Sequence, residues 1–210
     1  VTSDGLVTNT LGTSNLRLGV NAGDSITSGG NYNTVVGDEA GTAITTGDHN
    51  TAVGYSSLVA NTTGGQNTAS GFKAMFSNTT GEDNTATGYQ ALYANTTGAS
   101  NAAYGLFALT ANTTASNNTA VGHSSLKANT TGTGGTAVGK GTLDANTTGS
   151  NNSALGANAL GANTTGTANV AVGTAALEAN TTASNNTAVG FYSLLANTTG
   201  DLNVATGKDC

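Results

Sequence analysis

The chain contains no proline, no tryptophan and a single cysteine, and only 8% of its 210 residues are charged. Leu, Ile, Val and Phe together account for one residue in six, less than a chain normally uses to build a thick core. Low hydrophobicity usually signals disorder, but disordered chains also carry a high net charge, and here it is −6. We therefore predict no conventional enzyme core and no enzymatic activity. Either the chain is unfolded, or it builds a thin core by repetition.

Other scarcities exclude further classes of function. Five basic residues and a pI near 4.4 leave no electrostatic footprint for nucleic acid. No apolar run approaches the roughly 18 residues of a membrane helix, so we expect no membrane insertion. Cys210 is alone, which rules out an internal disulfide. His49 and His123 lie far apart in the sequence with no carboxylate or Cys grouping, so we predict no cofactor, metal or catalytic site.

What the chain does contain is an internal repeat. A glycine recurs at every seventeenth position from Gly37 to Gly207, and Gly19 precedes the series at a spacing one position longer. The consensus is N-T-A-V-G-x-x-S/A-L-x-A-N-T-T-G-x-x. We number repeat positions from this phase glycine, so that the −2 column is the residue two before it in every copy. Disordered tracts seldom hold one phase over ten copies, because nothing penalises a slip.

The constrained columns predict a parallel β-solenoid in which each repeat forms one coil. A helical-hairpin repeat needs roughly 33 residues, and two glycines per unit disfavour a helix. We expect two short strands per coil, N-T-A-V-G and S/A-L-x-A-N-T, joined by two turns. Alternation along these strands would direct Ala at −2, Leu at +4 and Ala at +6 into one narrow interior. We place the solenoid at residues 27–210 and an irregular connecting or capping segment at residues 1–26.

Stacking explains the near-invariance of Asn at +7. Each residue of such a solenoid lies about 4.8 Å from its copy in the previous coil, a spacing at which Asn side chains hydrogen-bond in ladders. The predicted ladder consists of Asn61, Asn78, Asn95, Asn112, Asn129, Asn146, Asn163, Asn180 and Asn197. These nine residues, with Asn117, Asn151 and Asn185, also match the N-x-S/T glycosylation pattern. The ladder is sufficient to explain the repeated Asn-Thr-Thr, and glycosylation remains the alternative.

These residues carry a resemblance to known fibrous proteins. The run N-T-A-V-G followed by S/A-L-x-A resembles the S-V-A-I-G-x-x-A-x-A repeat of trimeric autotransporter adhesin heads, which implies a left-handed parallel β-roll and a homotrimer. Residues 21–41 (NAGDSITSGGNYNTVVGDEAG), followed by runs such as NTAVGYSSLVANTTG, look still more like the repeat region of bacteriophage tail fibres upstream of a C-terminal intramolecular chaperone. The likeness extends from Asn21 to Asp209 and implies a location in the virion or on a cell surface.

Two outward-facing columns are candidate interaction sites. The −1 column is mostly apolar although it should point away from the interior, which marks a subunit interface or an aggregation hazard. We predict an interface of a parallel homotrimer at Val53, Val121, Val138, Leu155, Val172 and Val189. The +1 and +2 columns vary most, and their rings could stack on sugars of a host receptor or simply pack between coils. The candidate receptor contacts are Tyr55, Phe72, Tyr89, Phe107, Phe191 and Tyr192.

The sequence therefore predicts a fibrous structural segment that spaces or presents host-receptor binding parts of a phage tail fibre or surface adhesin. Its expected partners are copies of itself and, at the receptor contacts, a host surface glycan or other receptor. The alternative from a different class is an ice-binding β-solenoid, because flat Thr ladders order water. Against this alternative, adjacent Thr residues in Asn-Thr-Thr point to opposite faces. A polysaccharide-degrading fibre would need paired carboxylates, and the sequence shows no such cluster.

Overall fold

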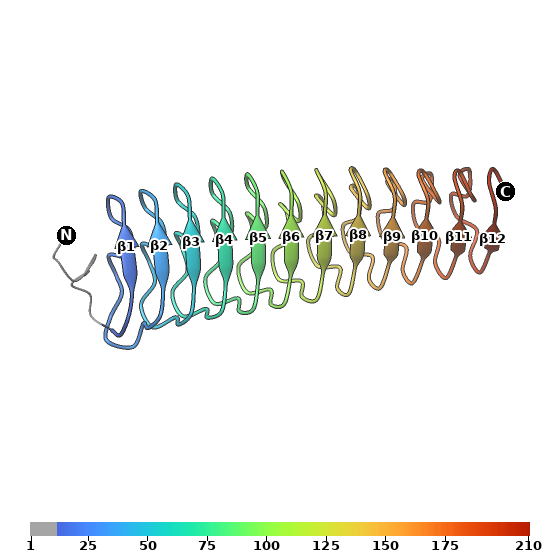
Figure 1. The fold of residues 1–210 in the computed structure, drawn as a ribbon. Helices are drawn as coiled ribbons and strands as arrows, with labels where there is room; N and C mark the ends of the chain where they lie inside the picture. Colours follow the sequence, from blue (N-terminus) through green and yellow to red (C-terminus); the bar gives the residue numbers. More distant parts are fainter. Residues whose placement is uncertain (1–11) are drawn as a thin grey trace.

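The computed structural model describes residues 12–210 as a rod of stacked coils, with the first and last of the described residues at opposite ends of the rod (Figure 1). Each coil contributes one short strand, and the twelve strands form a single sheet in sequence order. The strands are β1 Leu16–Leu18, β2 Thr34–Val36, β3 Thr51–Val53, β4 Thr68–Ser70, β5 Thr85–Thr87, β6 Ala102–Tyr104, β7 Thr119–Val121, β8 Thr136–Val138, β9 Ser153–Leu155, β10 Val170–Val172, β11 Thr187–Val189 and β12 Val204–Thr206.

Every strand pairs in parallel with its own copy in the next coil. Ala52 lies opposite Ala69, its copy one repeat later, and the same step of one repeat holds from β2 to β12. Only the first step differs, because Arg17 lies opposite Val35 and this coil is therefore one residue longer. The described residues contain no helix. The prediction of a parallel β-solenoid with one repeat per coil is confirmed.

The second predicted strand, S/A-L-x-A-N-T, is wrong. This part of the coil consists of consecutive turns, closed in the third coil by hydrogen bonds from Ser57 N to Gly54 O and from Asn61 N to Leu58 O. Ser56 and Leu58 adopt positive φ angles of 50° and 53°, and the same two columns do so in most coils. A left-handed conformation costs a non-glycine residue about 1–2 kcal/mol, but burying a Leu side chain contributes about 1.5–3 kcal/mol.

This difference changes which residues face the core. Ala at −2 and Leu at +4 are fully buried, as predicted, and the Leu column from Leu58 to Leu177 has an exposed fraction of at most 1%. Ala at +6, exemplified by Ala60, is only partly buried, whereas the small residue at +3, exemplified by Ser57, is fully buried. The strand rule of alternating faces fails here because the backbone reverses direction within the turns. Each coil therefore contributes one Leu, at +4, and two small residues, at −2 and +3, to the core.

The phase glycine is required by the close approach of neighbouring coils. Gly54 has a φ of 126°, and a Cβ atom at this position would lie 2.6 Å from the carbonyl oxygen of Gly71 in the next coil. Any side chain would push the coils apart at this corner, in addition to the strain of its backbone conformation. The strict recurrence of glycine once per repeat follows from this contact.

The first coils build the same core with different residues. Gly23 and Gly41 stand at the +4 position, and Ile26 and Ile44 at +7 fill the interior in place of Leu. A Cβ atom on Gly41 would lie 2.8 Å from Cδ1 of Ile44. A large residue at +7 therefore requires glycine at +4, and the two positions change together. This exchange explains why the Asn column at +7 begins only at Asn61.

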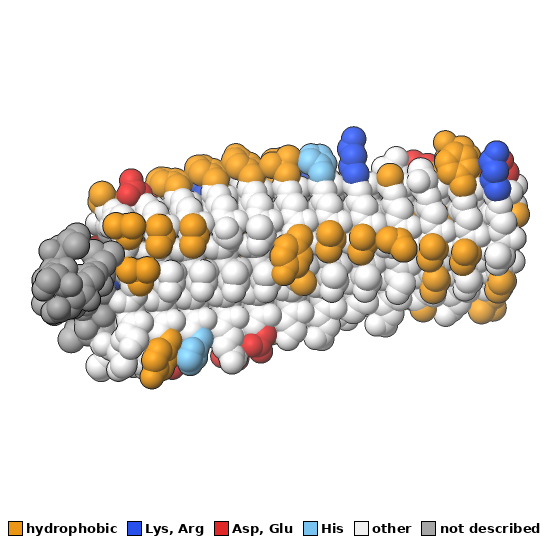
Figure 2. Space-filling model, viewed as in Figure 1, with side chains coloured by type: hydrophobic (Ala, Val, Ile, Leu, Met, Phe, Trp, Pro, Cys, Tyr) orange, Lys and Arg blue, Asp and Glu red, His pale blue; other side chains and the backbone are white. Residues whose placement is uncertain are grey.

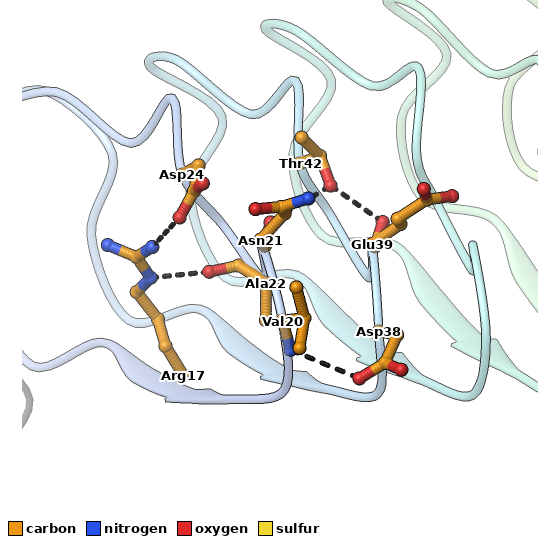
Figure 3. Close-up of polar contacts among 8 residues, drawn as sticks. All are labelled: Arg17, Val20, Asn21, Ala22, Asp24, Asp38, Glu39 and Thr42. Atoms are coloured by element: carbon orange, nitrogen blue, oxygen red, sulfur yellow. Dashed lines mark hydrogen bonds and ion pairs between the residues drawn. The ribbon is translucent and has the colours of Figure 1, made fainter.

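The first coil has a charged residue in one of the core columns. Arg17 occupies the −2 column in β1, where later coils have Ala or Val, and its guanidinium group donates to Ala22 O and to the Asp24 carboxylate (Figure 3). Asp38 accepts a hydrogen bond from Val20 N of the preceding coil. Strand β1 lies within the segment expected to be irregular, residues 1–26, and pairs with β2. Residues 1–11 of that segment lie outside the described residues.

We expect the rod to be modular in length. Deleting Thr119–Gly135 removes one whole coil, keeps every later column in phase and should shorten the rod by about 4.8 Å. Deleting only Lys127–Gly134 leaves β7 and Leu126 in place but shifts all following columns by half a coil, so we expect aggregation or degradation. Small-angle X-ray scattering and circular dichroism would compare the two variants. Equal tolerance of both deletions would contradict a stacked solenoid.

Candidate interaction surfaces

The Asn residues at +7 form a continuous series of buried side-chain hydrogen bonds. Nδ2 of Asn78 donates to Oδ1 of Asn61 at 2.8 Å, and Nδ2 of Asn95 donates to Oδ1 of Asn78 at 2.7 Å. The same bond joins each following pair up to Asn197 and Asn180. The second Nδ2 hydrogen reaches a backbone carbonyl later in the same turn, as from Asn78 to Gly81. Each side chain thus joins two coils and closes its own turn.

A second Asn column, at −4, also forms hydrogen bonds between coils. It was not singled out from the sequence. The backbone N of Asn50 donates to Oδ1 of Asn33, and Nδ2 of Asn50 donates to the carbonyl of Gly64, each at 2.9 Å. The signal was present as the first letter of the consensus. It was missed because Asn before a strand is ordinarily a turn residue, and only the stacked coils show that its side chain lies inside.

These contacts bear on the glycosylation alternative. The Asn residues of the Asn-Thr-Thr triplets from Asn61 to Asn180 are buried, with exposed fractions of at most 1%, and their amide groups are bonded. A glycan could not be attached to them without opening the coil. The pattern residues Asn117, Asn151 and Asn185, in contrast, are exposed.

The predicted interface residues all lie on the outer face of the sheet. Val53, Val121, Leu155 and Val189 are 36–51% exposed, while Val138 and Val172 are partly buried. No charged residue occurs at the first or third position of any of the twelve strands, which are the positions that face outward. Figure 2 shows hydrophobic side chains along the middle of this face, with red and blue side chains gathered at its upper and lower edges.

From β2 onward, charged residues occur only in the turns. From Asp38 onward, every Asp, Glu, Lys and Arg lies at +1, +2, +5, +11 or +12. The columns at +6, +8 and +9 carry no charge over the same range. The +6 column holds Ala or Ser, and the +8 and +9 columns hold Thr. Hydroxyl groups at +8 donate to the backbone of the next coil, as from Thr62 to Thr79 O at 3.1 Å. The Thr side chains at +9, such as Thr63, are exposed.

The six candidate receptor contacts form two groups. Tyr55, Phe72 and Tyr89 stack in one row, with centroid distances of 5.5 and 5.1 Å, and Phe107 meets Tyr89 edge-on at 5.5 Å. Phe191 and Tyr192 contact one another near the C-terminal end of the rod, with centroids 3.9 Å apart.

Three residues next to the first group, Lys73, Phe76 and Tyr93, were not predicted from the sequence. Phe76 and Tyr93 stack at +5 with a centroid distance of 5.1 Å. The Lys73 ammonium lies close to both Phe72 and Phe76, 5.4 and 5.1 Å from their ring centroids. Aromatic residues recurring at +5 in two consecutive copies were the available signal, but +5 appeared only as a variable position.

The remaining titratable groups are dispersed. His49 stacks on Tyr32 at 4.9 Å and His123 meets Phe107 edge-on at 6.5 Å, so each histidine belongs to an aromatic contact. Within residues 12–210 there is no group of three or more His, Cys, Asp or Glu side chains suited to a metal ion. That part of the chain also holds no helix long and apolar enough to cross a membrane.

Comparison with known proteins adds no relative. No protein-family model, curated protein or solved structure matches the chain. The interpretation of its surfaces therefore depends on their own geometry and chemistry.

The −4 column has one interruption that yields a test. Gly135 replaces Asn; its own N donates to Oδ1 of Asn118 at 2.8 Å, but it has no side chain to accept from the following coil. Gly135→Asn should restore the ladder and raise the free energy of unfolding by about 1–2 kcal/mol. Gly135→Ala is the matched control, because it removes the same backbone freedom without adding an amide. Denaturant unfolding that shows no advantage of Asn over Ala would contradict the ladder's contribution.

Proposed function

We propose that this chain is a rigid structural segment of a fibre or adhesin that assembles with copies of itself through the outer face of its sheet. The observation that carries the proposal is the absence of charge from the outward positions of all twelve strands, together with the confinement of charge to the turns from β2 onward. A protein surface normally mixes both signs of charge over all faces. Excluding charge from one long face is expected where another chain covers it.

The composition of this face supports a protein partner. Val and Leu side chains at −1 alternate with Thr and other uncharged residues at −3, so the face is flat, partly apolar and free of desolvation penalties for charge. A row of Val and Leu along a rod is otherwise an aggregation hazard. In a symmetric assembly, identical chains can bury this apolar surface against one another. The likeness to trimeric adhesin heads favours a parallel homotrimer.

The rod itself supports a spacing role. Each coil contacts only its neighbours, and twelve coils at about 4.8 Å give a length near 55 Å. Such a shaft, on a virion or a cell surface, holds receptor-binding parts away from the particle, as the resemblance to tail-fibre repeats implies. We assign it no catalytic role.

One observation favours the second candidate, an ice-binding solenoid. The +9 column is Thr in ten consecutive coils from Thr46 to Thr199, and these side chains are exposed. An exposed position needs no particular residue for packing, so its invariance indicates either a demand of the turn or a periodic ligand such as ordered water. Because the +8 hydroxyls are bound to the backbone, only one line of Thr is presented on this corner.

Changing Val121, Val138 and Val172 together to Lys should abolish assembly, because three ammonium groups would be buried without partners. The matched control is Asn117, Asn151 and Asn185→Lys, which adds the same charge at exposed turn positions. Light scattering and sedimentation velocity should report a trimer for the unmodified chain and the control, and monomers or insoluble material for the Val variant. A well-behaved monomer without any substitution would overturn the assembly.

A thermal-hysteresis measurement tests the second candidate. The proposed structural role predicts no depression of the freezing point beyond the colligative effect. The variant with Thr97, Thr114 and Thr131 changed to Val keeps the shape of the side chains but removes their hydroxyl groups. If the unmodified chain shows hysteresis and this variant does not, the ice-binding function replaces the structural one.

A further inference from the structure

The turns between Tyr55 and Lys140 carry a surface unlike the rest of the protein. We define the aromatic–basic strip as the side chains at +1, +2 and +5 in the six turns that follow β3 to β8, up to Lys140. Seen along the upper edge of Figure 2, a row of hydrophobic side chains continues into a His and then a Lys. The strip is about 24 Å long, five coil steps of about 4.8 Å.

The strip is basic although the protein is acidic. Lys73, Lys127 and Lys140 all lie on it, and Lys127 and Lys140 are exposed. Between residues 49 and 143 the only acidic residues are Glu82 and Asp83, which lie at +11 and +12. Three of the five Lys and Arg residues of a chain with net charge −6 therefore gather on one side of six coils. Asp144, next to Lys127 in the +5 column, marks the end of the strip.

Five rings of the strip lie in two stacks, which leaves the ring edges as their free surface. Phe72 is stacked between Tyr55 and Tyr89 with interplanar angles of 19° and 8°, so both of its faces are covered by neighbouring rings. Phe76 and Tyr93 cover one another in the same way at +5. The π-electron density makes a ring face negative and a ring edge positive. In these two stacks the negative ring faces that meet one another are hidden, and the positive edges remain beside the lysines, whereas Phe107 lies perpendicular to Tyr89 and is not stacked.

We propose that the aromatic–basic strip binds an extended acidic polysaccharide. Carboxylate groups of the polymer pair with Lys73, Lys127 and Lys140, and its hydroxyl oxygens contact ring edges and the hydroxyl groups of Tyr55 and Tyr89. The proposal rests on the proposed function in one respect, that a surface fibre meets such polymers, and it gives the receptor contacts a ligand class.

The ring geometry separates this ligand from single-stranded nucleic acid. Bases bind proteins chiefly by stacking on free aromatic faces, and the faces of Phe72 are already covered. A sugar polymer with carboxylates at intervals needs no free face to use ring edges and ammonium groups. Phe191 and Tyr192 lie outside the strip, and the one Lys beside them, Lys208, is paired with Asp209 at 3.4 Å.

The test uses the full chain and a purified oligogalacturonate, with binding followed by isothermal titration calorimetry at low and high salt. The neutral control ligand is the same oligosaccharide with its carboxylates methyl-esterified. Lys73, Lys127 and Lys140→Gln should weaken binding by about tenfold or more, since charge-assisted contacts are lost, and high salt should weaken binding of the unmodified chain. Lys208→Gln is the matched protein control and should leave the affinity within about twofold, because its charge is already paired.

Three results would overturn the proposal: no binding of oligogalacturonate, equal binding of the esterified ligand, or equal affinity of the triple variant and Lys208→Gln. Tighter binding of an oligodeoxythymidylate of matched charge would assign the strip to nucleic acid instead. Light scattering on the same samples separates this proposal from the assembly. A monomer that binds the acidic ligand refutes only the assembly, and a trimer that does not bind refutes only the strip.

Discussion

In this protein, residues of each coil form hydrogen bonds with the equivalent residues of the next coil. Nearly every other feature of the structure depends on this matching of equivalent residues. The Asn side chains at +7 donate to the side chain of the same residue one repeat earlier, and the strands pair identical positions. A residue that differed in length or shape would lose its bonds to two neighbours at once. Repetition is therefore the condition for satisfying buried polar groups in a chain with few large apolar residues. The thin core is adequate because the amide ladders supply the order that a thicker core would otherwise provide.

The same constraint sorts the surface. Positions that bond to their copies, or face the core, cannot vary, and substitutions accumulate at +1, +2, +5, +11 and +12, where all charges from Asp38 onward lie. The outer sheet positions are exposed or partly exposed and yet remain uncharged in twelve strands. Exposure alone does not account for this restraint, which is why the sheet face carries the functional proposal. Where aromatic residues occur in adjacent variable positions, stacking gives them one shared geometry.

The fold could be predicted from the sequence because its signal is the period itself. The series from Gly37 to Gly207 fixed the coil length, and Ala at −2 and Leu at +4 identified the interior. The second strand was wrong because the left-handed conformation of residues such as Leu58 runs against the preference of Leu, and only packing between coils stabilises it. The inward Asn at −4 and the Lys73 contacts with two rings depend on how turns stack, which no single coil encodes. The candidate receptor contacts share a residue type, and their division into a stacked row and a separate pair depends on how the coils stack.

The stacking also determines how such a rod responds to tension. Hydrogen bonds between coils run along the rod axis, so a pulling force acts directly on the bonds of the terminal coil. A coil that detaches releases one repeat of chain, which spans about 60 Å when extended, in place of about 4.8 Å in the stack. Each detachment lengthens the rod roughly twelvefold over that coil while the remaining coils keep their structure. We therefore expect a rod built in this way to lengthen in equal steps under load, one coil at a time.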